Sequence, residues 1–193
     1  MKALPIIDEE PSNWTILQSD AVYDNGAQLR VMRQTVQLPD TRIVDDYFRI
    51  DLPSFTSVYA VTEDNEVLLL RQYKHGAGRV CLTLPGGQVD PGEDPEFSAR
   101  RELLEETGYG GGRWVTGPSL VLHGNQGIAR AHVFVASHVI KLGEACSDDL
   151  EDAVLVTRRR AYLREAILRG ELPVTSHVAT IGIAEALFAA AKP

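Results

Sequence analysis

The 193-residue sequence has few cysteines, no long apolar run and fewer basic than acidic residues. Its two cysteines, Cys81 and Cys146, lack the spacing of metal ligands, which favours reduced thiols over a disulfide or a zinc site. No segment approaches the roughly 18 uninterrupted apolar residues of a membrane-spanning helix, and the first 14 residues lack the apolar stretch of a secretory signal. We therefore expect a cytoplasmic protein with no membrane partner.

The formal net charge of −8 also argues against one class of partner. Proteins that track a nucleic-acid backbone usually carry a basic patch or stripe. The three consecutive arginines at 158–160 are too few to form one, and we interpret them as the solvated face of a helix. We therefore expect no nucleic-acid partner.

The pattern of residues changes near Leu52-Pro53. Before it, segments 14–18, 28–37 and 42–50 are rich in β-branched and aromatic residues and are separated by turn signals, which predicts a small antiparallel sheet. Such a sheet is too small to be stable alone. We divide the chain into a β-rich segment, 1–52, and a larger domain, 53–193.

The larger domain alternates predicted strands and helices. We expect strands at 57–61, 67–72, 80–84, 114–115, 119–122, 131–137 and 153–156. Helices are expected after Asp94-Pro95 and near 161–169 and 177–191. This order predicts an α/β fold in which a mixed sheet lies between helices.

The helix after Asp94 has two chemically different sides. Asp94 and Pro95 form an N-cap and first helical residue, and Gly108 ends the helix. Phe97 and Leu104, seven residues apart, predict a packed side. The carboxylates of three glutamates lie on nearly the opposite side, at positions 102, 105 and 106.

These three glutamates have two interpretations. They can form an ordinary solvated face, because glutamate is a good helix former. Like charges at these spacings, however, destabilise an isolated helix by roughly 0.2–0.5 kcal/mol per pair. A cation bound among the three glutamates would offset this repulsion. Oxygen ligands without histidine or cysteine favour Mg²⁺, with Mn²⁺ as an alternative. A phosphorylated substrate would then be expected.

The wider spacing favours the metal interpretation. The run from Gly87 to Tyr109 resembles the signature of the Nudix hydrolases at every defined position except Tyr109, where an aliphatic residue is more usual. The resemblance implies a Nudix α/β/α sandwich and a metal site. It places the metal ligands on Glu102, Glu105, Glu106 and the carbonyl of Gly86, with Arg101 holding the glutamates in place.

The rest of the chain is similar to one branch of that family. Trp14, the segments 47–49, 71–74 and 84–87, and a late acidic loop occur in the order found in ADP-ribose and nucleoside-diphosphate-sugar pyrophosphatases. The resemblance implies metal-dependent hydrolysis of the pyrophosphate bond, giving a nucleoside monophosphate and a sugar phosphate. It also implies a homodimer formed through the amino-terminal sheet.

The branch takes its general base from a loop that follows the later strands. By resemblance we assign this role to Glu151, which precedes an aliphatic pair. The loop can instead be an ordinary solvated acidic segment. Other acids can replace Glu151 as the base, namely Glu105, Glu144, Asp148, Asp149 and Asp152.

Four positions are candidates for substrate binding. By resemblance, Lys74 stands where the branch more often has an arginine that contacts a phosphate, and Arg49 matches a family arginine at the end of the amino-terminal strand. Trp14 matches an aromatic residue that stacks on the base in some members, unless it is simply a core residue. Asn125 stands where many ADP-ribose-cleaving members have proline, so its loop lines the pocket or forms an ordinary turn. Strict ADP-ribose specificity is therefore not expected. Hydrolysis of nucleoside triphosphates or dinucleoside polyphosphates, or non-catalytic sensing of a nucleotide sugar, are the alternative functions.

Overall fold

The computed structural model describes residues 12–26, 28–146 and 152–190. The chain forms two compact units, which are considered separately. The first comprises residues 1–52 together with 123–128, and the second comprises 53–122 and 129–193. Residues 123–128, which the sequence pattern assigned to the larger part, group with the first unit.

The first unit is a three-stranded antiparallel sheet in the order β1-β2-β3. Its strands are β1 (Thr15–Asp24), β2 (Arg30–Gln37) and β3 (Ile43–Asp51). The amino-terminal antiparallel sheet expected from the sequence is therefore confirmed. Residues 123–128 run beside β3, where Ile50 N donates to Gln126 O at 3.2 Å and Leu52 N to Ile128 O at 2.8 Å.

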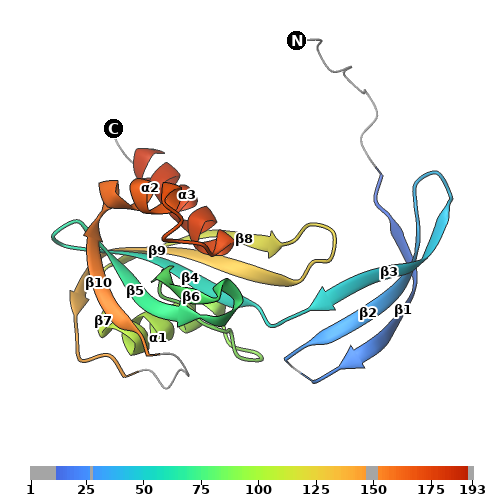
Figure 1. Cartoon of the computed structure of the whole chain (residues 1–193), viewed down its shortest axis with the longest axis horizontal. Helices are drawn as coiled ribbons and strands as arrows, with labels where there is room; N and C mark the ends of the chain where they lie inside the picture. The colour runs from blue at the N-terminus through green and yellow to red at the C-terminus, as the bar shows by residue number, and fades with distance from the viewer. Residues whose placement is uncertain (1–11, 27, 147–151, 191–193) are drawn as a thin grey trace, which may run out of the picture. The chain divides into compact units, whose positions relative to one another are not determined.

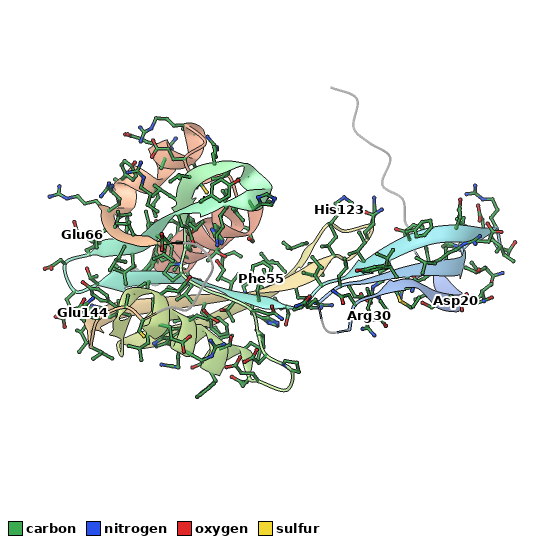
Figure 2. The ribbon with its side chains drawn as sticks, turned by 60° about the horizontal axis from the view of Figure 1, so that its bottom comes forward. Asp20, Arg30, Phe55, Glu66, His123 and Glu144 are labelled. Carbon is green, nitrogen blue, oxygen red and sulfur yellow. The ribbon has the colours of Figure 1, made fainter. Side chains whose placement is uncertain are left out.

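This small sheet buries little of its own apolar surface. All ten residues of β1 are exposed, and its side chains project freely from the ribbon (Figure 2). Ile16 is 54% exposed and Val22 54%. Val36 and Gln34 are among the few buried side chains. Burial of apolar area is the main favourable term in folding, so the sheet gains little stability from itself.

The second unit contains a seven-stranded mixed sheet. Its central order is β10-β5-β4-β9-β7, with β6 paired to β5 and β8 paired to β9. The β4–β9 pair is parallel, whereas the other pairs are antiparallel. The strands are β4 (Phe55–Thr62), β5 (Glu66–Lys74), β6 (Arg79–Thr83), β7 (Tyr109–Gly110), β8 (Arg113–Leu122), β9 (Ala129–Lys141) and β10 (Val154–Arg159).

One expected pair of strands is a single strand. Segments 114–115 and 119–122 both belong to β8, which pairs with β9 along its length. The register shifts between Thr116 and Ser119, at Gly117-Pro118. Proline cannot donate a ladder hydrogen bond. The sequence therefore predicted two strands where the structure has one strand with a bulge.

Helices cover both faces of the seven-stranded sheet. The helix α1 (Pro95–Thr107) lies on one side, and α2 (Arg160–Leu168) and α3 (Thr175–Ala190) lie on the other (Figure 1). Successive β4 residues show the division, because Val58 packs in the cluster that contains Leu103 of α1, whereas Tyr59 packs in the cluster that contains Leu163 of α2. The expected α/β/α sandwich is confirmed.

The arginine run at 158–160 is not a helix face. Arg158 and Arg159 end β10, and Arg160 begins α2. Arg160 Nη2 lies 2.7 Å from Glu185 Oε2. The prediction was wrong because two of the three arginines lie in the strand and the third is paired with Glu185. Within the described ranges, no helix is long and apolar enough to cross a bilayer.

Candidate active site

The helix α1 begins and ends at the residues that the sequence indicated. The side chain of Asp94 accepts hydrogen bonds from Glu96 N at 2.9 Å and Phe97 N at 3.1 Å. Gly108, with a φ of 72°, ends the helix through a bond from its N–H to Leu104 O. A left-handed conformation at this position favours glycine. These caps fix which residues of α1 face the sheet.

The packed side of α1 differs from the prediction. Phe97 is 64% exposed and Leu104 is 43% exposed, so they do not form the buried side. The buried residues are Ser98, Ala99, Leu103, Glu106 and Thr107. Small residues allow the helix to approach the sheet closely. The spacing of the two large apolar residues was therefore a misleading signal.

The turn before α1 is held tightly against β4. Val58 N donates to Pro85 O and Thr56 N donates to Gly87 O, both at 2.8 Å. Gly86 has a φ of 139°, and a β carbon there would lie 2.2 Å from Thr56 O. An L side chain cannot be placed here without moving the backbone. The turn therefore requires glycine at position 86.

Two glutamates of α1 reach this turn. Glu106 Oε2 accepts a hydrogen bond of 2.7 Å from Gly86 N, and Glu106 is only 8% exposed. The carboxylate of Glu102 fills the space beside Gly87, where a β carbon would lie 2.4 Å from Glu102 Cδ. A buried carboxylate is costly unless it is hydrogen-bonded or paired. The structure thus brings Gly86, Glu102 and Glu106 together.

Arg101 links three carboxylates beside the turn. Its Nη1 donates to Glu102 Oε1 at 2.8 Å and Glu105 Oε2 at 3.0 Å, and its Nε donates to Glu93 Oε1 at 3.1 Å. The hydrogen bonds from Arg101 lower the pKa of Glu93, and the bond to Glu93 is the largest cause that raises the pKa of Arg101. The guanidinium therefore offsets the repulsion among the glutamates.

The donors at this place suit a hard divalent cation. They are carboxylates and a backbone carbonyl, the oxygen ligands that Mg²⁺ uses. Within residues 12–26, 28–146 and 152–190, no group of three or more histidine, cysteine or acidic side chains is arranged so that it could hold a metal ion. Glu102 and Glu105 instead bind Arg101. Binding of a cation would require these carboxylates to turn toward it.

Lys74 lines a pocket in the same unit. The pocket has a volume of about 650 Å³ and lies between the end of β5 and the start of α3, with His75, Arg79 and His177 also lining it. His177 Nδ1 accepts a hydrogen bond of 3.2 Å from Leu84 N, one residue before Pro85. Burial, followed by the charge of Lys74, lowers the pKa of His177 to about 4.

The contact of His177 with Leu84 was missed by sequence reasoning. The two residues lie far apart in the chain, and one histidine near a helix start carries no signal of its own. A neutral imidazole can accept at Nδ1, whereas a protonated one cannot. The low pKa therefore keeps this acceptor available next to the glycine turn.

The remaining predicted substrate residues lie in the first unit. Arg49 Nε donates to Asp51 Oδ1 at 3.0 Å, and Tyr47 Oη donates to Asn125 O at 2.8 Å. Trp14 meets Tyr47 edge to face, with ring centroids 5.5 Å apart. Trp14 is 51% exposed, so its interpretation as a core residue is wrong.

Glu151, Asp148 and Asp149 lie outside the described residues. Of the other acids considered as bases, Glu144 has 97% of its side chain exposed and lies 3.8 Å from Lys141, and Asp152 is exposed. The backbone just before residues 147–151 is hydrogen-bonded to α1, because Cys146 N donates to Glu105 O at 2.8 Å.

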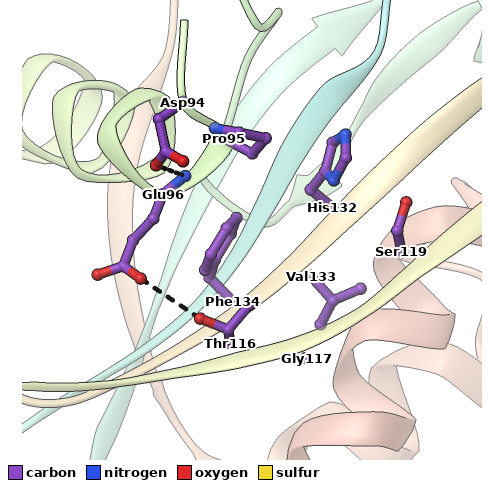
Figure 3. Close-up of a pocket in the computed structure, with 9 residues that line it drawn as sticks. All are labelled: Asp94, Pro95, Glu96, Thr116, Gly117, Ser119, His132, Val133 and Phe134. Atoms are coloured by element: carbon purple, nitrogen blue, oxygen red, sulfur yellow. Dashed lines mark hydrogen bonds between the residues drawn. The ribbon is translucent and has the colours of Figure 1, made fainter.

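A second pocket, of about 340 Å³, lies beside the start of α1 and above β8 and β9 (Figure 3). Thr116 Oγ1 donates to Glu96 Oε2 at 3.3 Å, and Arg100 pairs with Glu96 at 2.7 Å. Burial, followed by the charge of Arg130, lowers the pKa of His132 in the pocket. Glu96 therefore has its own partners, Arg100 of α1 and Thr116 of β8, separate from the group around Arg101.

Comparison of the sequence with known protein families identifies the family of this chain. The model of the NUDIX domain matches residues 53–165. The chain belongs to the Nudix family. That match includes the glycine turn, α1 and the group around Arg101, and Nudix hydrolases generally need divalent cations.

Individual relatives share shorter stretches. The ADP-ribose pyrophosphatase of Bacillus subtilis is 39% identical over 57 residues, which are 30% of this chain and 31% of the relative. That of Mycobacterium tuberculosis is 31% identical over 101 residues, 50% of this chain and 46% of the relative. The matched part thus spans about a third of the first of these relatives and just under half of the second.

The fold has a solved counterpart over nearly its whole length. The crystal structure of an ADP compounds hydrolase superposes with a TM-score of 0.79, covering 95% of this chain and 98% of the other. Its sequence identity is 18%. At that identity the likeness shows a shared fold.

Proposed function

We propose that this chain is a metal-dependent pyrophosphohydrolase for ADP-ribose or a related nucleoside diphosphate sugar. The products would be a nucleoside monophosphate and a sugar phosphate. The observation that carries the proposal is the contact between the nearly buried Glu106 carboxylate and Gly86 N, which joins α1 to the glycine turn. The names of the matched relatives support the substrate class.

The proposed metal is Mg²⁺, with Mn²⁺ as the alternative. Its ligands would be Glu102, Glu105, Glu106 and the carbonyl of Gly86, and Arg101 would position the glutamates. Such a cation neutralises phosphate charge and lowers the pKa of water, which supplies a nucleophile at neutral pH. The hydrogen bonds of Arg101 to Glu102 and Glu105 support its positioning role.

Proton removal from the attacking water is assigned to Glu151, with Glu105 as the second candidate. A general base must come within hydrogen-bond reach of the water in the substrate complex. Glu105 is 44% exposed at its side chain and is held by Arg101 at 3.0 Å. That exposure leaves it able to reach solvent, which supports keeping it as the alternative.

Substrate binding is assigned to Lys74, Arg49, Trp14 and Asn125. Lys74 and Arg49 would contact phosphate or sugar. The exposed indole of Trp14 offers a face on which a base can stack. Tyr47 holds the backbone of Asn125 beside β3, which supports a shaped loop at this position.

A homodimer formed through the first unit completes the proposal. Exposed apolar side chains along β1, including Ile16, Leu17 and Val22, support this because large exposed apolar patches usually mark interaction sites. We also propose a cytoplasmic location, which agrees with the free thiols of Cys81 and Cys146.

The test is a substrate panel assayed with Mg²⁺, with Mn²⁺ and with chelator. It contains ADP-ribose, ADP-glucose, GDP-mannose, UDP-glucose, NADH, diadenosine polyphosphates and nucleoside triphosphates. We expect metal-dependent release of nucleoside monophosphate from ADP-ribose or a nucleotide sugar. A preference for triphosphates would refute the substrate class, and no turnover of any compound would refute the proposed hydrolysis.

A further inference from the structure

A third pocket, lined by several arginines, lies on the α2 side of the sheet, away from α1. It has a volume of about 320 Å³, and Arg71, Arg79 and Arg158 line it together with Tyr162 and Glu171. These residues come from β5, β6, β10, α2 and the chain after α2, elements that can be followed in Figure 1. The pocket therefore gathers residues from five parts of the fold.

Arg71 enters the pocket where the helical cover of the sheet ends. Along the same face of β5, Val67 and Leu69 are fully buried in the core cluster that contains Leu163. Two residues further on, Arg71 is exposed. The cluster on the opposite face contains Leu103 of α1. The pocket and α1 thus lie on different sides of the sheet.

The other two arginines are anchored by neutral groups. Arg79 Nη2 donates to Gly170 O at 2.5 Å, and Arg158 Nη1 donates to Thr157 O at 2.8 Å. A carbonyl orients a guanidinium but does not neutralise its charge. Both side chains are therefore directed while their positive charges remain available to a ligand.

Among the described residues that line the pocket, the one carboxylate is that of Glu171, and it already has donors. Glu171 Oε1 accepts from Arg169 Nε at 2.7 Å, and Glu171 Oε2 accepts from Tyr162 Oη at 2.5 Å. These two hydrogen bonds are the largest causes that lower the pKa of Glu171, and Arg158 contributes a smaller electrostatic effect. Arg169 thus offsets the charge of Glu171, and an excess of cations remains.

This excess is unusual for the chain, whose net charge is −8. Guanidinium groups bind phosphate oxygens through paired, charge-assisted hydrogen bonds. Tyr162 adds an aromatic ring, with the Arg158 guanidinium 5.4 Å from its centroid. We propose that this pocket binds a small phosphate-bearing molecule, independently of the metal and of hydrolysis. The volume suits one small ligand and not a polymer.

The test uses inorganic pyrophosphate as the probe, measured by calorimetry on the full chain in EDTA. Chelation removes the metal on which phosphate binding at the proposed active site depends. We expect the wild type to bind pyrophosphate and the Arg71→Gln/Arg158→Gln variant to bind at least tenfold more weakly. The Arg113→Gln/Arg164→Gln variant changes charge equally on exposed arginines elsewhere and should bind within twofold of the wild type.

Three results would overturn the proposal. They are no binding by the wild type, equal losses in both double variants, or a loss in Lys74→Gln that exceeds the loss in Arg71→Gln/Arg158→Gln. The last would place the anion in the pocket beside α3. Circular dichroism checks that each variant is folded. A chain that binds pyrophosphate in EDTA but cleaves no nucleotide sugar would refute the proposed function while supporting this site.

Discussion

The two units differ in how much apolar surface each buries within itself. In the second unit, Val67, Leu68, Leu69 and Leu70 are completely buried between helices. In the first unit, all ten residues of β1 are exposed. A sheet of three strands needs a packed apolar face for stability. The second unit therefore has a buried core of its own, and the exposed sheet of the first unit supports the proposed homodimer.

The same contrast separates the two halves of the proposed chemistry. The groups assigned to metal binding all lie in the second unit and are locked to one another through Arg101 and Gly86. Arg49, Trp14 and Asn125, assigned to substrate, lie in the first unit. Substitutions at the proposed metal ligands in the second unit should therefore affect turnover or stability, and substitutions along β1 in the first unit should affect assembly.

The largest effect is expected from Glu106→Gln. The change keeps the shape of the side chain but removes the charge of a proposed ligand. Because metal catalysis supplies several kcal/mol, kcat should fall roughly 100-fold to 1000-fold. Turnover of the preferred nucleotide sugar measures this, together with Mg²⁺ affinity from calorimetry, and the oligomeric state should not change.

The matched control is Glu96→Gln on the same helix, whose carboxylate pairs with Arg100 and Thr116. Its turnover should stay within roughly twofold of the wild type, because exposed ion pairs contribute little. If Glu106→Gln retained wild-type turnover and Mg²⁺ affinity, the ligand assignment would be wrong.

The next largest effect is expected from Gly86→Ala in the turn against β4. The added β carbon would lie 2.2 Å from Thr56 O at a φ of 139°. Strained backbone of this kind costs about 1–3 kcal/mol, so the free energy of unfolding should fall by that amount in urea denaturation. Turnover should fall as well, because Gly86 N holds Glu106.

Gly182→Ala is the control for this substitution. It lies inside α3 with no heavy atom within 4 Å of the added carbon, and alanine is favoured over glycine in a helix by up to about 1 kcal/mol. Its stability should stay equal or rise. Equal losses in both variants would show that the clash with Thr56 is not the cause.

A smaller effect, confined to assembly, is expected from Ile16→Asp in β1. Burying an isoleucine side chain contributes roughly 1.5–3 kcal/mol, so the dimer dissociation constant should rise at least tenfold. Sedimentation equilibrium measures the constant. Ile140→Asp makes the same change at a 45% exposed position of β9 and should leave assembly unaltered. A monomeric wild type would refute the proposed dimer.

Sequence reasoning succeeded where a local pattern has one physical solution. Asp94-Pro95 and Gly108 set the ends of α1, because each helix end favours a particular residue type and conformation. It failed where packing decides between equal patterns. Phe97 and Leu104 have the spacing of a buried side, yet Ala99 and Leu103 are buried, because the close approach of α1 to the sheet favours small residues.

Contacts between distant segments could not be predicted at all. The bond from Leu84 N to His177 and the pocket around Arg71 and Arg158 each join segments whose sequences carry no shared signal. Residues 123–128 were likewise assigned to the larger domain. Their backbone bonds to β3 follow from where the β8–β9 hairpin ends, which the sequence of 123–128 does not indicate.

The smallest effect is expected from the pH dependence of His177. Its pKa is about 4 in the folded chain, against an ordinary value of 6.5. The unfolded chain therefore takes up a proton first as the pH falls, so this residue lowers stability progressively from about pH 6.5 toward pH 4. The slope contributed by one such group is at most about 1.4 kcal/mol per pH unit.

The variant His177→Asn isolates this effect, because its side-chain oxygen can accept from Leu84 N but does not titrate. Urea denaturation of both proteins between pH 7 and pH 4.5 should show a shallower loss of stability in the variant, while the two agree near pH 7. Parallel curves would mean that other groups set the acid limit. The pKa of His177 would then differ little between the folded and the unfolded chain.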